Sequence, residues 1–335
     1  MKKFICLFLA LVMCIALFGA CAADKSPDTA PEADSQPAAK ATVNLAVLKG
    51  PTGMGCSELL KKNADGTAFN NYNFTIAGSP DQITGKLVSG ELDIAALPTN
   101  AVSALYNKTK GGVTLIALNT LGVLYILEKG DSVACIEDLK GKTVLASGKS
   151  STAEYVLNYI LEKNGLVPGE DVTVDYAAEH TEAASQALSG KYDIVMLPEP
   201  FVTSVTAQNA DFKVKINLTE EWKKLGAGEL SMGAIAVRTA FLNENKAAVD
   251  SFLKEYAESV AFTNSNIEEA AAIIEEYDIA KAAVAQKAIP NCNIVFIDGS
   301  EMKQNAESFL KIIAEADPAS VGGALPDSAF YYIDE

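Results

Sequence analysis

The fold of this chain is decided by a stretch that occurs twice, first as Leu87-Val88-Ser89-Gly90-Glu91-Leu92-Asp93-Ile94-Ala95-Ala96-Leu97-Pro98. It returns without a gap, one hundred residues later, as Ala187-Leu188-Ser189-Gly190-Lys191-Tyr192-Asp193-Ile194-Val195-Met196-Leu197-Pro198, and six of the twelve positions are identical. The pattern predicts a helix that ends at a left-handed glycine, then a buried strand, then a proline that turns the chain into another helix. The repeat therefore indicates two similar halves.

The sequence around the two copies alternates short apolar runs with helical stretches. In the first half we expect strands at 43–48, 74–77 and 92–97 and helices at 56–63 and 81–89; in the second half, strands at 143–146, 172–174 and 192–197 and helices at 152–164 and 181–189. The last third reads as helices at 246–263, 267–276, 280–288 and 300–316. This alternation predicts an α/β fold with two parallel-rich sheets flanked by helices. Ligands of such sheets bind outside the carboxyl ends of the strands, which places both Leu-Pro corners in one cleft.

Length and composition fit a globular protein of two domains. The chain has 335 residues, of which 49% are hydrophobic and 21% charged. It carries 27 Lys and Arg against 43 Asp and Glu, a formal net charge of −16, which disfavours nucleic-acid binding.

The scarcity of two residue types restricts the chemistry further. Arg238 is the only arginine and His180 the only histidine, so a histidine metal centre or a Ser-His-Asp triad would depend wholly on His180. We therefore predict no catalytic residue, no metal ligand and no cofactor. We expect His180 to be solvated at the start of a helix. We expect Arg238 to be peripheral and to cap surface acids, which counts against nitrate or a sulfonate as ligand.

The N-terminus predicts export. Residues 1–20 have a basic head, an apolar run of about 15 residues and small residues at the end, as in a secretory signal peptide. Cys21 follows Gly-Ala as in a bacterial lipobox, although Phe18 departs from the usual Leu, Val or Ile. We expect Cys21 to carry lipid and residues 21–41 to form a flexible tether. The alternative is ordinary cleavage that releases a soluble protein. Removal of residues 1–20 takes away Lys2 and Lys3, which leaves 25 cations against 43 acids, or −18.

Three further cysteines, Cys56, Cys135 and Cys292, are widely spaced and form no C-x-x-C pair. They predict neither a zinc ribbon nor a redox motif. We expect all three to be buried small hydrophobes.

An exported head, a tether and two halves that each end in Asp-Ile-x-x-Leu-Pro resemble an extracytoplasmic solute-binding protein of an ABC transporter. Within that class the chain is similar to the nitrate/sulfonate/taurine and thiamine-precursor binding family, on the stretches 85–95, 137–144, 146–148, 151–152, 165–166 and 193–200. The resemblance spans about 42–316. It implies a two-lobed, periplasmic-binding-protein-like (type II) fold with a double hinge crossover near 127–131 and 229–235. Lobe 1 would be residues 42–128 plus 232–335, and lobe 2 residues 129–231.

The strongest candidates for ligand contact are Gly148, Ser150, Ser151 and Thr152, in the loop before a predicted helix. Backbone N–H groups at a helix N-terminus favour an anionic or strongly polar group, to which Lys149 could add charge. The alternative is a capping sequence, with Ser150, Ser151 or Thr152 as N-cap. In the matching loop of lobe 1 we expect Thr52, Gly53 and Met54 to contact the ligand, because glycine lets the backbone approach closely; a plain turn is the alternative.

The Leu-Pro corners supply the remaining candidates. Pro98, Thr99 and Asn100 come from lobe 1, and Glu199 occupies the corresponding corner of lobe 2, where the resemblance implies an acidic residue against the ligand. A carboxylate argues against a doubly charged anion, although a helix-start glutamate is an equal alternative. Further candidates for the cleft wall are Asn119, Tyr176 and Met232, together with Thr120, Tyr125 and Phe201. For each of them taken singly, a place in the core or at the rim is the favoured alternative.

The function that these features imply is the substrate-binding component of an ABC importer. It would capture a small polar or heteroaromatic solute and deliver it to permease and ATPase subunits, as a lipid-anchored monomer on the outer face of the cytoplasmic membrane or in the periplasm. Thiamine-precursor pyrimidines fit Glu199 and the aromatic candidates better than nitrate does. The alternatives are a fold-related enzyme of pyrimidine or menaquinone precursor synthesis and an extracytoplasmic ligand sensor.

Overall fold

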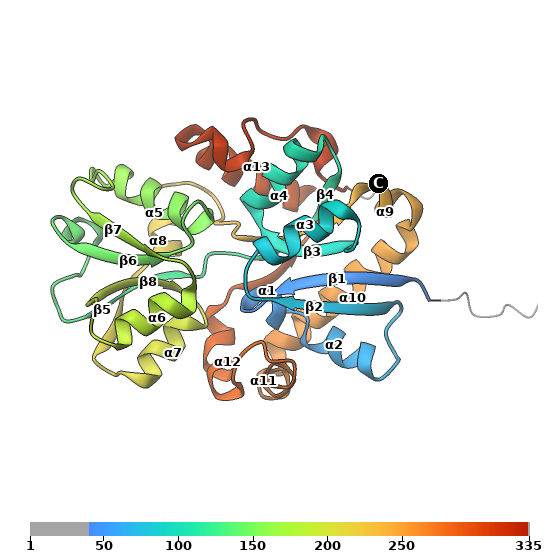
Figure 1. Cartoon of the computed structure of the whole chain (residues 1–335), viewed down its shortest axis with the longest axis horizontal. Helices are drawn as coiled ribbons and strands as arrows, with labels where there is room; N and C mark the ends of the chain where they lie inside the picture. Colours follow the sequence, from blue (N-terminus) through green and yellow to red (C-terminus); the bar gives the residue numbers. More distant parts are fainter. Residues whose placement is uncertain (1–39, 334–335) are drawn as a thin grey trace, which may run out of the picture. The chain divides into compact units, whose positions relative to one another are not determined.

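The structure, a computed structural model, describes residues 40–333 (Figure 1). The predicted signal peptide, Cys21 and nearly all of the predicted tether lie outside the described residues. Within 40–333, no helix is both long and apolar enough to cross a membrane.

Two mixed β-sheets form the framework. The six-stranded sheet has the order β11-β4-β10-β3-β1-β2, with the strands β1 (Thr42–Leu48), β2 (Asn71–Ala77), β3 (Ile94–Pro98), β4 (Val113–Thr120), β10 (Gly233–Arg238) and β11 (Ile294–Ile297). The five-stranded sheet has the order β7-β6-β8-β5-β9, with β5 (Leu124–Lys129), β6 (Thr143–Ser147), β7 (Thr173–Ala177), β8 (Ile194–Pro198) and β9 (Phe212–Asn217).

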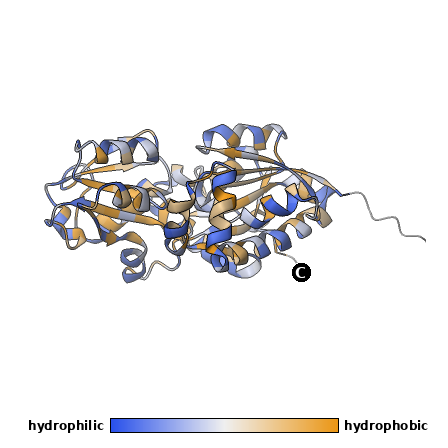
Figure 2. Ribbon diagram, turned by 90° about the horizontal axis from the view of Figure 1, so that it is seen from below, coloured by the Kyte–Doolittle hydropathy of each residue, from blue (hydrophilic) through white to orange (hydrophobic). Residues whose placement is uncertain are grey.

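Helices cover the sheets. The helices are α1 (Pro51–Met54), α2 (Ser57–Ala64), α3 (Asp81–Ser89), α4 (Thr99–Thr109), α5 (Thr152–Lys163), α6 (His180–Leu188), α7 (Phe201–Gln208), α8 (Leu218–Lys224), α9 (Thr239–Glu244), α10 (Lys246–Ser265), α11 (Ile267–Glu276), α12 (Ala282–Ala288) and α13 (Gly299–Ala316). Figure 2 shows hydrophobic strands inside and helices whose outer faces are hydrophilic. The predicted α/β fold class is confirmed.

The repeated stretch folds in the same way in both halves. Gly90 and Gly190 have φ of +85° and +79°, the left-handed conformation expected after a helix. β3 then pairs in parallel with β1, and β8 pairs in parallel with β6. The sheets are nevertheless mixed, since β10 runs antiparallel to β3 and β4, and β5 runs antiparallel to β8 and β9. These antiparallel strands are the ones that carry the chain from one sheet to the other.

The first crossing between the sheets lies earlier than predicted. It runs through 121–123, so residues 124–128, which were assigned to lobe 1, form most of β5 in the five-stranded sheet. The second connection, 225–232, leads from α8 to β10. Residues 113–127 are mostly apolar, with Thr114, Asn119, Thr120 and Gly122 among them, so the hydrophobic pattern alone does not mark the boundary. Sheet membership does not measure motion, so the division into two moving lobes stays a prediction.

Two predictions about individual residues in the framework need correction. Cys56 and Cys292 are buried, but Cys135 is exposed, because it precedes a 3-10 turn at the surface. Arg238 does not cap a surface acid: its Nη2 donates to Asp93 Oδ1 at 2.9 Å, and Asp93 is buried. Asp93 also accepts from the backbone and side-chain nitrogens of Asn44, so it fastens β1 and β10 to the start of β3.

Candidate functional site

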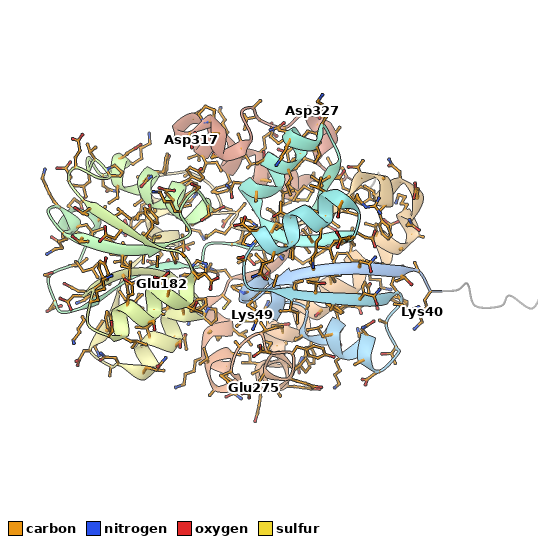
Figure 3. All side chains as sticks on the ribbon, viewed as in Figure 1. Lys40, Lys49, Glu182, Glu275, Asp317 and Asp327 are labelled. Carbon is orange, nitrogen blue, oxygen red and sulfur yellow. The ribbon has the colours of Figure 1, made fainter. Side chains whose placement is uncertain are left out.

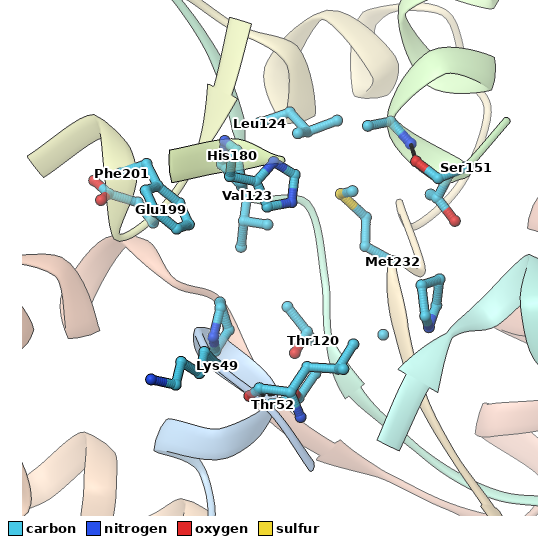
Figure 4. Close-up of a pocket in the computed structure, with 17 residues that line it drawn as sticks. Lys49, Thr52, Thr120, Val123, Leu124, Ser151, His180, Glu199, Phe201 and Met232 are labelled. Carbon is cyan, nitrogen blue, oxygen red and sulfur yellow. Dashed lines mark hydrogen bonds between the residues drawn. The ribbon is translucent and has the colours of Figure 1, made fainter. Parts of the chain in front are cut away.

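A cavity of about 140 Å³ lies where the strands of both sheets end (Figure 4). It is lined from the six-stranded side by loop and strand-end residues, from the five-stranded side by the starts of α5, α6 and α7, and from the crossings by short apolar side chains. The lining residues are Leu48, Lys49, Pro51, Thr52, Pro98, Thr120, Val123, Leu124, Ser151, Thr152, Ala153, His180, Pro198, Glu199, Phe201, Met232 and Gly233. Both Leu-Pro corners therefore contribute a proline to one cavity.

The loop after β1 forms the short helix α1 and offers one of its three candidates to the cavity. Thr52 lines the cavity, and its hydroxyl donates to the carbonyl of Leu48 at 3.1 Å. A Cβ on Gly53 would lie 2.6 Å from that same carbonyl oxygen, so the glycine serves the packing of the turn. Met54 is fully buried in the core, with its sulfur 3.9 Å from the Cys292 sulfur, and does not line the cavity.

The loop before α5 is capped by its own side chains. Ser151 is the N-cap and accepts from the backbone N–H of Ala153 at 3.3 Å, and the Glu154 carboxylate accepts from the N–H of Ser150 at 2.5 Å. Ser151 and Thr152 line the cavity, while Gly148 and Ser150 line a neighbouring groove. Because a carboxylate already occupies this helix start, its attraction for a fully charged oxyanion is reduced.

Glu199 lines the cavity, but its carboxylate is hydrogen-bonded to Thr203 and points away from the cavity. The residue is 2% exposed, and its carboxylate accepts from the backbone N–H and the hydroxyl of Thr203 at 3.1 and 3.0 Å. In Figure 4 its oxygens point away from the His180 ring. Burial raises its pKa, and the two bonds from Thr203 oppose that rise. The carboxylate therefore caps the first turn of α7.

His180 is the clearest error of the sequence interpretation. It is not solvated: its Nδ1 lies 2.5 Å from the Ser147 hydroxyl, its ring centre lies 5.4 Å from that of Phe201, and it lines the cavity. Burial lowers its pKa to about 4, so the imidazole is neutral near pH 7. Topology could have located it, since a helix that follows a parallel strand begins at the ligand-binding edge of the sheet.

The other candidates divide between the cavity and its surroundings. Pro98 and Met232 line the cavity, as do Thr120 and Phe201, and among the residues that prediction omitted are Pro51, Val123, Leu124 and His180. Thr99 and Asn119 are buried behind it, and the Asn119 amide has no protein partner. Tyr176 is half-buried, with the Lys149 ammonium 5.9 Å from its ring centre, and Tyr125 lies outside the lining. Asn100 lies beside the cavity, in the wall of the neighbouring groove.

No free cation faces the cavity among the residues that line it. The Lys49 ammonium is 2.7 Å from Asp278, on the solvent side, and Figure 4 shows it pointing out of the cavity. Arg238 is committed to Asp93. Over 40–333 there is also no cluster of three or more His, Cys, Asp or Glu residues that could hold a metal ion. Hydroxyls, a neutral imidazole and apolar side chains are what a ligand would meet.

The fold matches solved structures of transport proteins. An ABC transporter protein from Parabacteroides distasonis shares 24% identity and a TM-score of 0.72, over 88% of this chain and 99% of that one. The aliphatic sulphonate binding protein SsuA of Escherichia coli gives 16% identity and a TM-score of 0.70, over 87% and 92% of the two chains. The nitrate-binding protein NrtA of Synechocystis gives 13% and 0.58, over 84% of each.

Sequence comparison assigns the chain to a family, whereas the structural matches show only the fold. No curated protein matches the chain. Residues 67–288, however, match the profile of a family described as the periplasmic substrate-binding protein of phosphonate ABC transporters. That stretch includes both copies of the repeat and all five strands of the second sheet. This chain therefore belongs to the phosphonate ABC transporter periplasmic substrate-binding protein family.

Proposed function

We propose that this chain captures a small, flat, polar or heteroaromatic solute, such as a pyrimidine, for an ABC importer. Family membership supplies the transport role, and the cavity supplies the ligand class. The observation that carries the proposal is a mostly apolar, one-ring cavity whose polar groups are uncharged hydroxyls and a neutral imidazole.

Size supports a single ring. A protein cavity of roughly 150 Å³ accommodates benzene, and this cavity has about 140 Å³. Phe201 and His180 present two rings in its wall, 5.4 Å apart and tilted, against which a flat solute can pack. Of the hydroxyls in the cavity wall, those of Thr52, Ser151 and Thr152 already donate to protein acceptors, whereas the Thr120 hydroxyl has no protein partner and is available to hydrogen-bond the edge of a solute.

Charge argues against a doubly negative solute. Phosphonates carry up to two negative charges. The family takes its description from phosphonate transport, but the ligand of each member depends on the residues of its own cavity. Here the nearest ammonium, on Lys49, is paired with Asp278, and the start of α5 already holds the Glu154 carboxylate. A buried acid, Glu199, stands in the opposite wall. An unpaired buried dianion would have no compensating charge.

We infer further that the mature protein is a monomer, anchored through lipid on Cys21, that docks on the membrane permease of a transporter whose other partner is the ATPase. The lipobox-like Gly-Ala-Cys and the polar tether of residues 21–41 support this part. Incorporation of labelled fatty acid in the natural envelope, lost in Cys21→Ala, is the expected result. A chain released into the medium without lipid would overturn the anchor.

The ligand class is tested by calorimetric titration and thermal unfolding of the mature chain. The panel contains 4-amino-5-hydroxymethyl-2-methylpyrimidine, taurine, ethanesulfonate, methylphosphonate and nitrate. We expect the pyrimidine to bind and to stabilise the chain by about 2.7 kcal/mol at a hundred times its Kd. Stabilisation by the sulfonates, methylphosphonate or nitrate alone would refute the ligand class.

A pair of phenylalanine variants localises the binding. Phe201→Ala removes a ring from the cavity wall and should weaken pyrimidine binding at least tenfold. Phe262→Ala removes a partly buried ring from α10 that does not line the cavity, and should leave the Kd unchanged. Equal Kd values for wild type and Phe201→Ala would place the ligand elsewhere.

A further inference from the structure

Two hollows lie side by side between the sheets. The first is the cavity described above, of about 140 Å³. The second is a groove of about 720 Å³ that runs past the starts of α4 and α5, and Pro98 and Ser151 line both. A solute longer than one ring would have to extend from the cavity into the groove.

A hydrogen bond between two side chains joins the wall of the cavity to the wall of the groove. The Thr152 hydroxyl donates to the Asn100 side-chain oxygen at 2.7 Å. Thr152 lines the cavity but not the groove, and Asn100 lines the groove but not the cavity. The two residues are 2% and 5% exposed, and they come from helices that follow strands of different sheets. The bond therefore links the two walls across the junction of the sheets.

The Asn100 side chain is held in this orientation from behind. Its Nδ2 donates to the carbonyl of Ser320 at 3.2 Å, in the 3-10 turn Pro318–Val321 that follows α13. The amide nitrogen is thereby committed, which leaves the amide oxygen facing Thr152. Rotation of the amide would lose both bonds and leave buried polar groups unpaired.

The groove beyond this bond could hold an extension of a ligand. Apolar side chains of Pro80, Ala101 and Leu105 line it, and charges of both signs stand in it on Asp81, Lys108 and Asp317. Asp317 is labelled in Figure 3, just past the end of α13. The groove therefore has the volume and the polar and apolar side chains that a longer solute would contact. The Asn100–Thr152 bond lies between this groove and the cavity.

We infer that the Asn100–Thr152 hydrogen bond is a partition that limits ligand length, so that this protein selects one-ring solutes and rejects the same ring with a tail. The inference rests on the proposed function for the identity of the ring. It goes beyond it by naming the two residues that set the length limit.

The test compares two uncharged probes that share one ring. These are 4-amino-5-hydroxymethyl-2-methylpyrimidine and the same ring with a hexyloxymethyl group at the 5-position. For the wild type we expect the short probe to bind at least a hundredfold more tightly. Asn100→Ala, which opens the partition, should reduce that ratio at least tenfold. Lys108→Ala, which enlarges the groove without touching the partition, should keep the wild-type ratio.

The variants also define what overturns the inference. A folded Asn100→Ala that keeps the wild-type ratio refutes it, and so does a wild type that binds both probes equally. If Asn100→Ala does not fold, Thr152→Ala replaces it, because it removes the hydroxyl and the methyl group from the other side of the partition; the same reduced ratio is expected.

Failure of the proposed function gives a different result. If the wild type binds neither probe, the pyrimidine class is wrong, and crystal structures of the wild type and Asn100→Ala then decide the partition. A chamber that is continuous with the groove in the variant and separate in the wild type supports the inference. Hollows that stay separate in both proteins overturn it.

Discussion

At the scale of single residues, burial of His180 changes its charge in the pH range just below neutrality. It is half-buried between Ser147 and Phe201, and burial lowers its pKa to about 4 from an ordinary 6.5. Between these values the unfolded chain binds a proton at His180 and the folded chain does not. The free energy of unfolding that this residue contributes is therefore fully present above pH 6.5 and falls as the pH drops toward 4.

His180→Gln should remove that pH dependence. We expect wild type to lose up to about 3 kcal/mol more than the variant between pH 7 and pH 4. Urea unfolding of both proteins at several pH values in this window measures the difference, and the carboxylates common to both cancel. Parallel pH profiles would mean that His180 titrates in the folded chain as it does in water.

Arg238 has a structural role. The sequence did not indicate this role, because its partner Asp93 lies 145 positions away. Its guanidinium pairs at 2.9 Å with Asp93, whose carboxylate is buried at the start of β3. Removing the cation leaves that carboxylate with only the two nitrogens of Asn44.

Arg238→Ala should therefore destabilise the fold by about 3 kcal/mol, the usual cost of leaving a buried charge unpaired. The Kd for ligand should stay at the wild-type value, because neither residue lines the cavity. Denaturant unfolding gives the first quantity and titration the second. A loss below 1 kcal/mol would show that Asn44 alone suffices for Asp93.

At the scale of elements, the crossing at 121–123 depends on a glycine. A Cβ at Gly122 would lie 2.1 Å from the Thr219 hydroxyl on α8 and 2.9 Å from Leu230, in the second crossing. The two crossings thus approach each other at a position where no side chain fits. Asn293 reaches the same place, since its side-chain nitrogen donates to the carbonyl of Gly122.

Gly122→Ala should cost about 2 kcal/mol through overpacking, and adding Thr219→Ala should restore part of the loss. Gly85→Ala is the matched control, because it lies inside α3 with open space around it. There we expect a gain of about 0.5–1 kcal/mol from helix propensity. Thermal unfolding of the wild type, Gly122→Ala, the double variant and Gly85→Ala measures both effects. An unchanged stability of Gly122→Ala would mean that the two crossings can move apart at little cost in free energy.

At the scale of the whole molecule, one hydrophobic cluster joins helices that pack on different sheets. Trp222 on α8, the only tryptophan, is fully buried, with ring centres 4.9 Å from Tyr159 on α5 and 5.7 Å from Phe309 on α13. α8 follows a strand of the five-stranded sheet, whereas α13 follows a strand of the six-stranded sheet. Movement of the sheets relative to each other would therefore change the surroundings of the indole.

Phe309→Ala should destabilise the chain by about 3–5 kcal/mol and shift the tryptophan emission to longer wavelength. Phe252→Ala is equally buried but belongs to the other cluster, on α10, so it should cost as much and leave the emission unchanged. Fluorescence of the folded variants distinguishes the two. Identical emission spectra of the wild type and Phe309→Ala would mean that the indole of Trp222 does not report on the contact between α8 and α13.

The sequence by itself determined the strand–proline–helix repeat, the left-handed glycines after the helices, an N-cap among Ser150, Ser151 and Thr152, and the family to which these belong. These features follow from contacts within about ten residues, which periodicity and turn chemistry record. It also identified eight of the residues that line the cavity: Thr52, Pro98, Thr120, Ser151, Thr152, Glu199, Phe201 and Met232.

Only the tertiary structure decided how those residues are used. His180 meets Ser147 across 33 positions, Asn100 meets Thr152 across 52, and Arg238 meets Asp93 across 145. Glu199 turned out to cap its own helix, and Gly53 to serve the packing of a turn. Such pairings depend on how two sheets meet and on which polar groups burial leaves together. Local alternation of apolar and polar residues carries no record of either.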